Sequence, residues 1–119
     1  MKHRSKPGTN HLASIKPSAG EIWLADLGLA AKVRPVLVLS YPEPDDARAL
    51  AIVAPLTSQI RSARGEIDLG KPSWLPKASA VNLQGLASFN HRFLQRKLGR
   101  LSEQQIYRVK TDLRELLDL

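Results

Sequence analysis

The sequence contains no cysteine, which excludes disulfide bonds, thiol catalysis and cysteine-ligated zinc. Stability must therefore come from side-chain packing. The longest apolar runs, at residues 36–39 and 50–56, are far too short to cross a bilayer. The basic N-terminus is not followed by the apolar stretch that a secretory signal needs. We therefore expect a cytoplasmic protein with no membrane segment.

The sequence also lacks the common motifs of nucleotide and ester hydrolysis. It has no GxxxxGK[ST], GxGxxG or GxSxG pattern. Its three histidines, His3, His11 and His91, show no paired metal-ligand spacing. The densest group of acids, at residues 43–46, includes Pro44 and is typical of an exposed turn. We therefore expect neither a metal nor a cofactor.

Basic residues are in excess. The chain has 119 residues, a formal net charge of +7 and a pI near 10.2, values that favour a polyanionic partner. Residues 1–18 lack apolar periodicity and are rich in proline, glycine and bases, so we expect a disordered extension there and one domain at 19–119. Two interpretations of the extension stay open: a solvated leader, or a contribution to nucleic-acid binding.

Three β-rich segments follow one another in the first half of the domain. They span residues 21–27, 36–40 and 49–54, and loops at 28–33 and 41–46 separate them. Pro35 lacks a backbone donor and restricts Arg34, so we expect this pair at the start of the second strand and not within it. Short connections predict an antiparallel meander. Further strands are expected at 66–69 and 79–86.

The clearest helix begins after Ser102, where Gln105 completes a capping-box pattern. An apolar stripe with helical spacing follows at Ile106, Val109, Leu113, Leu116 and Leu117. The preceding segment, 90–100, is rich in bases, and we interpret Gly99 as a break. Strands followed by one amphipathic helix predict a mainly β (α+β) small barrel of antiparallel strands with a C-terminal helix.

Without a metal, chemistry on a polyanion must come from side chains. Cleavage of RNA needs stabilisation of a phosphate that gains charge, and an arginine fork with hydroxyl donors suits that task. By themselves, Arg34, Thr57 and Ser58 are more typical of a solvated strand end and of a side-chain hydrogen bond to the backbone. Trp23 is likewise more typical of a core residue than of a platform for stacking bases.

The order of several motifs is more specific than any one of them. Gly-Glu-Ile-Trp at 20–23 is followed by Arg-Pro-Val-Leu-Val-Leu-Ser at 34–40, Pro-Leu-Thr-Ser at 55–58, Gln84 and the C-terminal helix. This ordered set resembles the MazF/PemK/Kid family of toxin endoribonucleases from type II toxin-antitoxin systems.

The resemblance implies an SH3-like barrel of the CcdB/PemK type, usually a homodimer. It implies a metal-independent endoribonuclease (mRNA interferase) that cleaves single-stranded RNA by 2′-hydroxyl attack. It also implies a cognate antitoxin whose disordered segment occupies the RNA groove. The family's catalytic roles fall on Arg34, as the phosphate-contacting cation, and Thr57, as its hydroxyl partner. Weaker candidates for RNA contact are Ser58, Gln84, Lys32 and Glu21, and the last matches a position that more often orders the loop.

One departure from the family pattern concerns the first loop. Family members typically have a longer loop with an acid before the arginine, whereas the loop at residues 28–33 is short and carries no acid. An unusual cleavage preference, a different general base or loss of activity therefore stay open, and His91 is the one ordinary candidate for a base. Two alternative functions also stay open: a barrel that binds RNA or protein without cleavage, and CcdB-like inhibition of gyrase.

Overall fold

Seven strands and one α-helix make up the described part of the fold. The computed structural model describes residues 16–26, 28 and 33–119. The strands are β1 (Glu21–Asp26), β2 (Val33–Ser40), β3 (Leu50–Thr57), β4 (Glu66–Gly70), β5 (Ser79–Asn82), β6 (Ala87–Asn90) and β7 (Leu94–Arg100). Two 3-10 turns, η2 (Leu83–Gly85) and η3 (His91–Phe93), flank β6, and helix α1 (Glu103–Leu117) follows β7. The mainly β fold with a C-terminal helix is confirmed.

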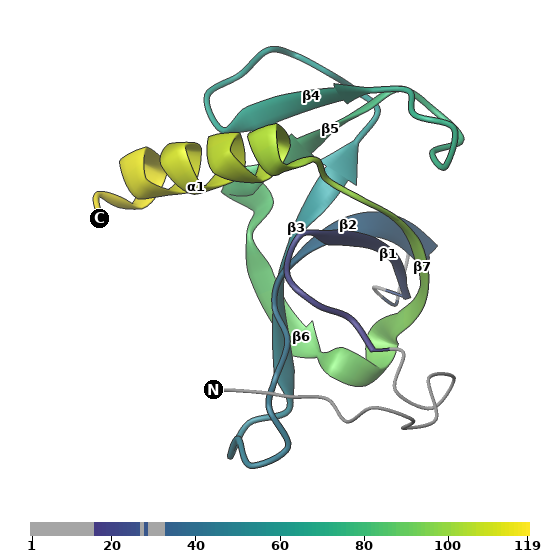
Figure 1. Cartoon of the computed structure of the whole chain (residues 1–119), viewed down its shortest axis with the longest axis vertical. Helices are drawn as coiled ribbons and strands as arrows, with labels where there is room; N and C mark the ends of the chain where they lie inside the picture. Colours follow the sequence, from purple (N-terminus) through teal and green to yellow (C-terminus); the bar gives the residue numbers. More distant parts are fainter. Residues whose placement is uncertain (1–15, 27, 29–32) are drawn as a thin grey trace.

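All strand pairs are antiparallel, in the order β4-β5-β3-β2-β1-β7, and β6 pairs with β3. The predicted meander of the first three strands is therefore correct. Figure 1 shows β1, β2, β3, β6 and β7 curling around a common centre, while β4, β5 and α1 lie together on one side.

Alternation along the meander strands separates two apolar clusters. Ile22 and Leu37 are cross-strand partners and belong to a cluster that also takes in Ile106 and Leu113 of α1. Val36 belongs to a second cluster. Its buried members are Ala25, Val36, Ala51 and Val53, and Tyr41, Phe89 and Leu94 pack against them. One cluster thus joins helix to sheet, and the other fills the barrel that β6 and β7 complete.

Two prolines lie inside strands, which corrects two expected boundaries. Pro35 is the third residue of β2 and pairs with Leu24, but the ladder between β2 and β3 begins only at Val36 and Pro55. At Pro35 the strand therefore has one ladder neighbour, an edge position that tolerates proline. Pro55 stands where β3 exchanges one partner, β6, for another, β5. Neither β5 nor β6 pairs with Pro55, so the strand continues past it to Thr57 with no ladder bond needed on that side.

The second half departs further from expectation. The strand expected at 79–86 ends at Asn82, whose side chain accepts a hydrogen bond from Gln84 N and starts η2. The basic segment 90–100 contains β7, which the sequence did not predict. Gly99 is part of this strand, and a β-carbon there would clash with Cδ2 of Trp74. Gly99 therefore makes room for an indole ring and is not a break.

The capping box of α1 is present as predicted. Ser102 accepts from Gln105 N at 3.1 Å, and Gln105 accepts from Ser102 N at 2.8 Å. The helix packs through Ile106, Val109, Leu113 and Leu116, while Leu117 is 50% exposed. No helix in the described part of the chain is long and apolar enough to cross a membrane. The boundary between the expected extension and the domain stays a prediction, since residues 1–15 lie outside the described residues.

Candidate active site

The start of β2 and the end of β3 border one cleft. Arg34 and Pro35 line it from β2, and Leu56 and Ser58 line it from β3 and the residue that follows. Lys77, in the segment before β5, and Ser79, the first residue of β5, line it as well. The cleft has a volume of about 170 Å³. Two of the predicted site residues, Arg34 and Ser58, thus share one hollow.

Thr57 lies between two residues of this cleft, Leu56 and Ser58. The last ladder pair of β2 and β3 is Val36 with Pro55, and two further positions along each strand are Arg34 and Thr57. Both residues are therefore at adjacent strand ends on the same side of the sheet. Thr57 Oγ1 accepts a hydrogen bond from Gln59 N at 3.0 Å. A hydroxyl that accepts one bond can still donate its own hydrogen.

The charge of the cleft is positive. Arg34 and Lys77 are its two cationic lining residues, both side chains are exposed, and no carboxylate lines it among the residues described. A guanidinium stays charged at any working pH and matches two phosphate oxygens with a planar pair of donors. Hydroxyls at Ser58 and Thr57 add neutral donors close by. This set of groups is suited to hold a phosphodiester and to stabilise added negative charge on it.

Lys77 is a cleft residue that the sequence did not single out. It belongs to the irregular stretch after β4, and nothing in its local pattern distinguishes it from a solvated lysine. Its place in the same cleft as Arg34 depends on contacts between segments far apart in the chain. Lys32, which was expected to contact RNA, lies outside the described residues.

Gln84 has a local structural contact and does not line the cleft. Its side-chain amide donates to the carbonyl oxygen of Arg64, and its Cγ lies against Gly65. These contacts join η2 to the loop that leads into β4.

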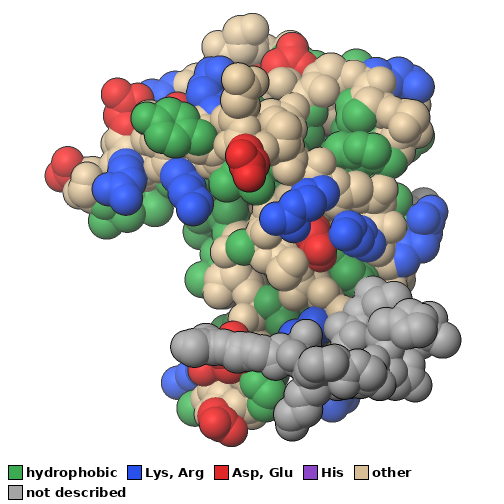
Figure 2. All heavy atoms as spheres, in the orientation of Figure 1, with side chains coloured by type: hydrophobic (Ala, Val, Ile, Leu, Met, Phe, Trp, Pro, Cys, Tyr) green, Lys and Arg blue, Asp and Glu red, His purple; other side chains and the backbone are tan. Residues whose placement is uncertain are grey.

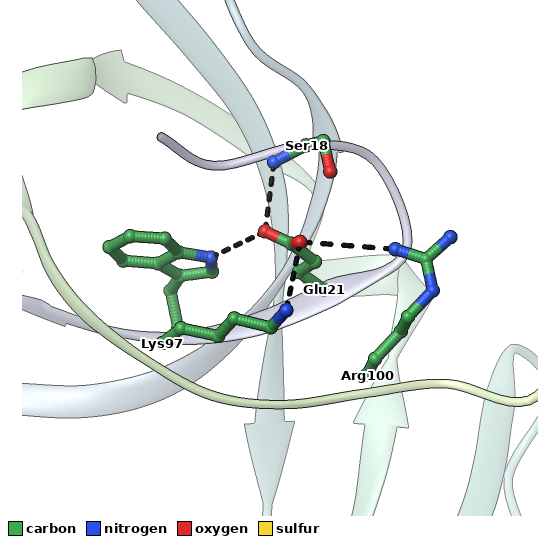
Figure 3. A network of polar contacts seen from close by, with 5 residues as sticks. Ser18, Glu21, Lys97 and Arg100 are labelled. Carbon is green, nitrogen blue, oxygen red and sulfur yellow. Dashed lines mark hydrogen bonds and ion pairs between the residues drawn. The ribbon is translucent and has the colours of Figure 1, made fainter. Parts of the chain in front are cut away.

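Glu21 is buried at the opposite end of β1 from Ala25, the residue that pairs with Arg34. Figure 3 shows four groups directed at its carboxylate. Oε1 accepts from Trp23 Nε1 at 2.9 Å and from Ser18 N at 3.0 Å. Oε2 lies 3.1 Å from Lys97 Nζ and 3.9 Å from an Arg100 nitrogen. We call these five residues the Glu21 network.

Burial raises the pKa of Glu21, but the bonds from Trp23, Ser18 and Lys97 together outweigh it and hold the pKa below its ordinary value. The carboxylate therefore stays charged and joins the segment before β1 to β7. Trp23 is only 5% exposed, which confirms its expected place in the core.

His91 is also outside the Arg34 cleft. It is half-buried, and its Nδ1 lies 2.9 Å from the hydroxyl of Tyr41. In the parts of the chain that the structure describes, no three His, Asp or Glu side chains gather as metal ligands. The identity of a general base stays open.

The fold is that of the MazF toxins. The structure of the Mycobacterium tuberculosis toxin MazF-mt6 superposes with a TM-score of 0.71 at 25% identity, over 83% of this chain and 97% of the other. A MazE-MazF structure from Deinococcus radiodurans gives a TM-score of 0.70 at 23% identity, over 87% and 97% of the two chains. The second likeness supports the fold alone.

Sequence similarity leads to a family. The chain is 34% identical over 103 residues to the "Probable endoribonuclease MazF5" of Mycobacterium tuberculosis, covering 86% of this chain and 94% of the relative. It is also 34% identical over 112 residues to the endoribonuclease MazF6 of that organism, covering 86% and 97%. Residues 18–117 match the family described as PemK-like, MazF-like toxin of type II toxin-antitoxin system. The chain belongs to this family.

Proposed function

We propose that this protein is the toxin of a type II toxin-antitoxin system and a metal-independent endoribonuclease that cleaves single-stranded RNA. The relatives named as endoribonucleases support the activity. The observation that carries the proposal is the cleft that Arg34, Ser58 and Lys77 line together, with Thr57 next to Ser58 in the chain. Single-stranded RNA as substrate implies action in the cytoplasm.

In the proposed reaction the ribose 2′-oxygen attacks the adjacent phosphorus and loses its proton. The bond from phosphorus to the 5′-oxygen breaks, and that oxygen takes up a proton. The products are a 2′,3′-cyclic phosphate and a 5′-hydroxyl end, so no water is consumed in this step. DNA lacks the attacking hydroxyl and is spared.

Arg34 is assigned to the phosphate oxygens as charge builds on the five-coordinate phosphorus, with Thr57 donating a hydrogen bond to the same group. One well-placed donor of this kind contributes about 3 kcal/mol to lowering a barrier. Ser58 and Lys77 are assigned to binding the strand. No carboxylate or histidine lines the described part of the cleft, so the proposal rests on stabilisation of charge and not on a named base.

The test compares the wild type with Arg34→Ala on single-stranded RNA in EDTA. We expect cleavage by the wild type and a loss of about 100-fold or more in the variant, since one such donor contributes 10²–10³ in rate. Arg114→Ala, which removes an exposed cation of α1, is the matched control and keeps full activity. Equal cleavage by wild type and Arg34→Ala removes Arg34 from the mechanism.

The same experiment separates the alternative functions. A binding barrel without activity leaves the RNA intact but still binds it, with an affinity that falls steeply as salt rises. A gyrase inhibitor gives no RNA products and arrests DNA gyrase.

Two protein partners belong to the proposal. We infer a cognate antitoxin, because structures of relatives include a MazE-MazF structure and an endoribonuclease in complex with its cognate antitoxin. We also infer a homodimer from the family resemblance. Light scattering at micromolar concentration checks the homodimer, and a monomer there would end that idea.

A further inference from the structure

A second, larger hollow lies on the side of the barrel formed by η3 and β7. Its cationic residues are Lys16, Arg92, Arg96 and Lys97, and the rings of Tyr41 and His91 are among the side chains that line it with them. These six residues are called the basic groove, and the hollow has a volume of about 620 Å³. Figure 2 shows Lys and Arg side chains on the β7 side of the molecule, next to an acidic side chain. None of the six lines the Arg34 cleft.

The charge of the basic groove is largely uncompensated. No carboxylate lines the hollow in the described part of the chain. Lys97 is paired with Glu21, but Lys16, Arg92 and Arg96 form no ion pair with any described residue. All three side chains are exposed. Three cations that line one hollow, none of them in an ion pair with a described residue, attract an anionic chain.

The rings of the basic groove are held in fixed positions. The Tyr41 hydroxyl and His91 Nδ1 are 2.9 Å apart, and the two rings meet edge to face with centroids 5.3 Å apart. Both residues are half-buried, and Tyr41 packs against the cluster inside the barrel. Cations for a backbone, combined with ordered rings for bases, are the features with which proteins bind single-stranded nucleic acid. An acidic peptide would use the charges but has no need of the rings.

The strand register relates the basic groove to the Arg34 cleft. Ala25 of β1 pairs with Arg34 on one side and with Leu94 on the other. Leu94 lines the same hollow as the basic groove. Across the sheet, the backbone of Arg34 is therefore separated from that of Leu94 by two strand spacings of roughly 4.8 Å each. A flexible strand bound at one hollow can therefore reach the other.

The hollow beside the basic groove has mixed charge. It shares Lys16, Tyr41 and His91 with the basic groove and is lined also by Glu43, Asp46 and Arg48. The two carboxylates offset the charge of the cations there, so the more favourable course for an RNA backbone leads along Arg92 and Arg96.

We propose that the basic groove binds the single-stranded RNA that flanks the phosphate held at Arg34. The assignment deepens the proposed function and rests on it for the identity of the substrate. Arg92 and Arg96 contact phosphates, and His91 contacts an unstacked base.

The test measures binding without cleavage, using a fluorescent 2′-O-methyl RNA oligonucleotide that has no attacking hydroxyl. We expect Arg92→Gln/Arg96→Gln to lower the slope of log affinity against log salt by about 1.4, which is about 0.7 for each of two phosphate contacts. This change in slope corresponds to about 25-fold weaker binding by the double variant than by the wild type at 0.1 M salt. The charge-matched control, Arg108→Gln/Arg114→Gln on the exposed side of α1, stays within about twofold of the wild type.

A second variant examines the rings. His91→Ala should weaken binding several-fold and leave the salt slope unchanged, because stacking involves no counterion release. Circular dichroism confirms that each variant is folded.

An unchanged affinity and salt slope in Arg92→Gln/Arg96→Gln overturns the proposal. So does a variant that binds RNA normally but loses binding to a synthetic acidic peptide, since the groove would then serve a protein. Because the probe cannot be cleaved, failure of the wild type to cut any RNA refutes the proposed activity and leaves this binding result standing on its own.

Discussion

Glu21→Gln is the substitution whose effect can be worked out most fully from the structure. The amide keeps one oxygen, which can still accept from Trp23 Nε1 and Ser18 N. It replaces the other oxygen by an NH₂ group that faces Lys97 Nζ, 3.1 Å away in the wild type. Hydrogen bonds to a charged group contribute about 1.5–3 kcal/mol and neutral ones about 1 kcal/mol. The Lys97 side chain is 44% exposed, so water screens that ion pair and its share is small.

We therefore expect Glu21→Gln to lower the free energy of unfolding by about 1.5 kcal/mol at pH 7. With a denaturant slope near 1.5 kcal/mol per molar, the urea midpoint falls by about 1 M. Glu21→Ala leaves the Trp23 and Ser18 donors without an acceptor and should cost about 3 kcal/mol. Glu115→Gln, an exposed acid of α1, is the control and should change stability by less than about 0.5 kcal/mol.

The pH dependence of the same variant gives a second check. The pKa of Glu21 is lower in the folded protein than its ordinary value of 4.5. The stabilisation is therefore present above pH 4.5 and is lost as pH falls through the folded pKa, because the unfolded chain binds the proton first. The difference between wild type and Glu21→Gln should shrink in that acid range. Equal urea midpoints at pH 7, or loss of RNA cleavage in folded Glu21→Gln, would refute a purely structural role.

Three further predictions concern packing, capping and the cleft. Gly99→Ala forces a β-carbon into the ring of Trp74 and should destabilise the fold by about 2 kcal/mol or more in urea unfolding. Trp74→Leu should restore part of this loss. A Gly99→Ala variant as stable as the wild type would contradict this packing. Ser102→Ala removes the cap of α1 and should lower the free energy of unfolding by about 1 kcal/mol. The control Ser73→Ala, at an exposed serine, should change it little. Equal losses in the two variants would mean that the cap contributes nothing specific. Lys77→Gln should raise KM for RNA more than it lowers kcat, because an exposed lysine in the Arg34 cleft binds substrate and transition state alike. A fall in kcat alone would assign it to the chemistry.

Local patterns were sufficient for the meander and the helix. Alternation along 21–27 and 36–40 fixes which side chains enter each cluster, and the Ser102 and Gln105 pair marks the helix start without help from distant residues. The predicted start of β2, at Pro35, and the predicted end of β3, at Pro55, were wrong, because an isolated sequence does not reveal where a strand gains or changes a ladder partner.

The closing strand β7 was missed for a physical reason. Its apolar residues, Leu94 and Leu98, are separated by Gln95, Arg96 and Lys97, so charge outweighs alternation in this segment. Gly99 resembles a break unless one knows that Trp74 packs on it. A strand of this kind is specified by its partners across the sheet.

In the candidate site, too, local motifs could be recognised in the sequence, whereas contacts between distant segments could not. Arg34 and the hydroxyl pair could be proposed because their motifs carry the family resemblance, but Lys77 could not, since no motif marks it. Glu21 could be noticed in sequence next to Trp23, whereas two of the groups at its carboxylate, Lys97 and Arg100, come from β7. These contacts with a strand far away in the sequence indicate that Glu21 is a structural acid and not one that contacts substrate.

The central claim is that one guanidinium and one hydroxyl act together on the same phosphate. A double-mutant cycle of Arg34→Ala and Thr57→Val, read from single-turnover cleavage of RNA in EDTA, tests it most directly. Residues that act as a unit are strongly non-additive, so the double variant should be about as slow as Arg34→Ala alone. Rate losses that multiply, or an Arg34→Ala protein that cleaves at the wild-type rate, would contradict the account.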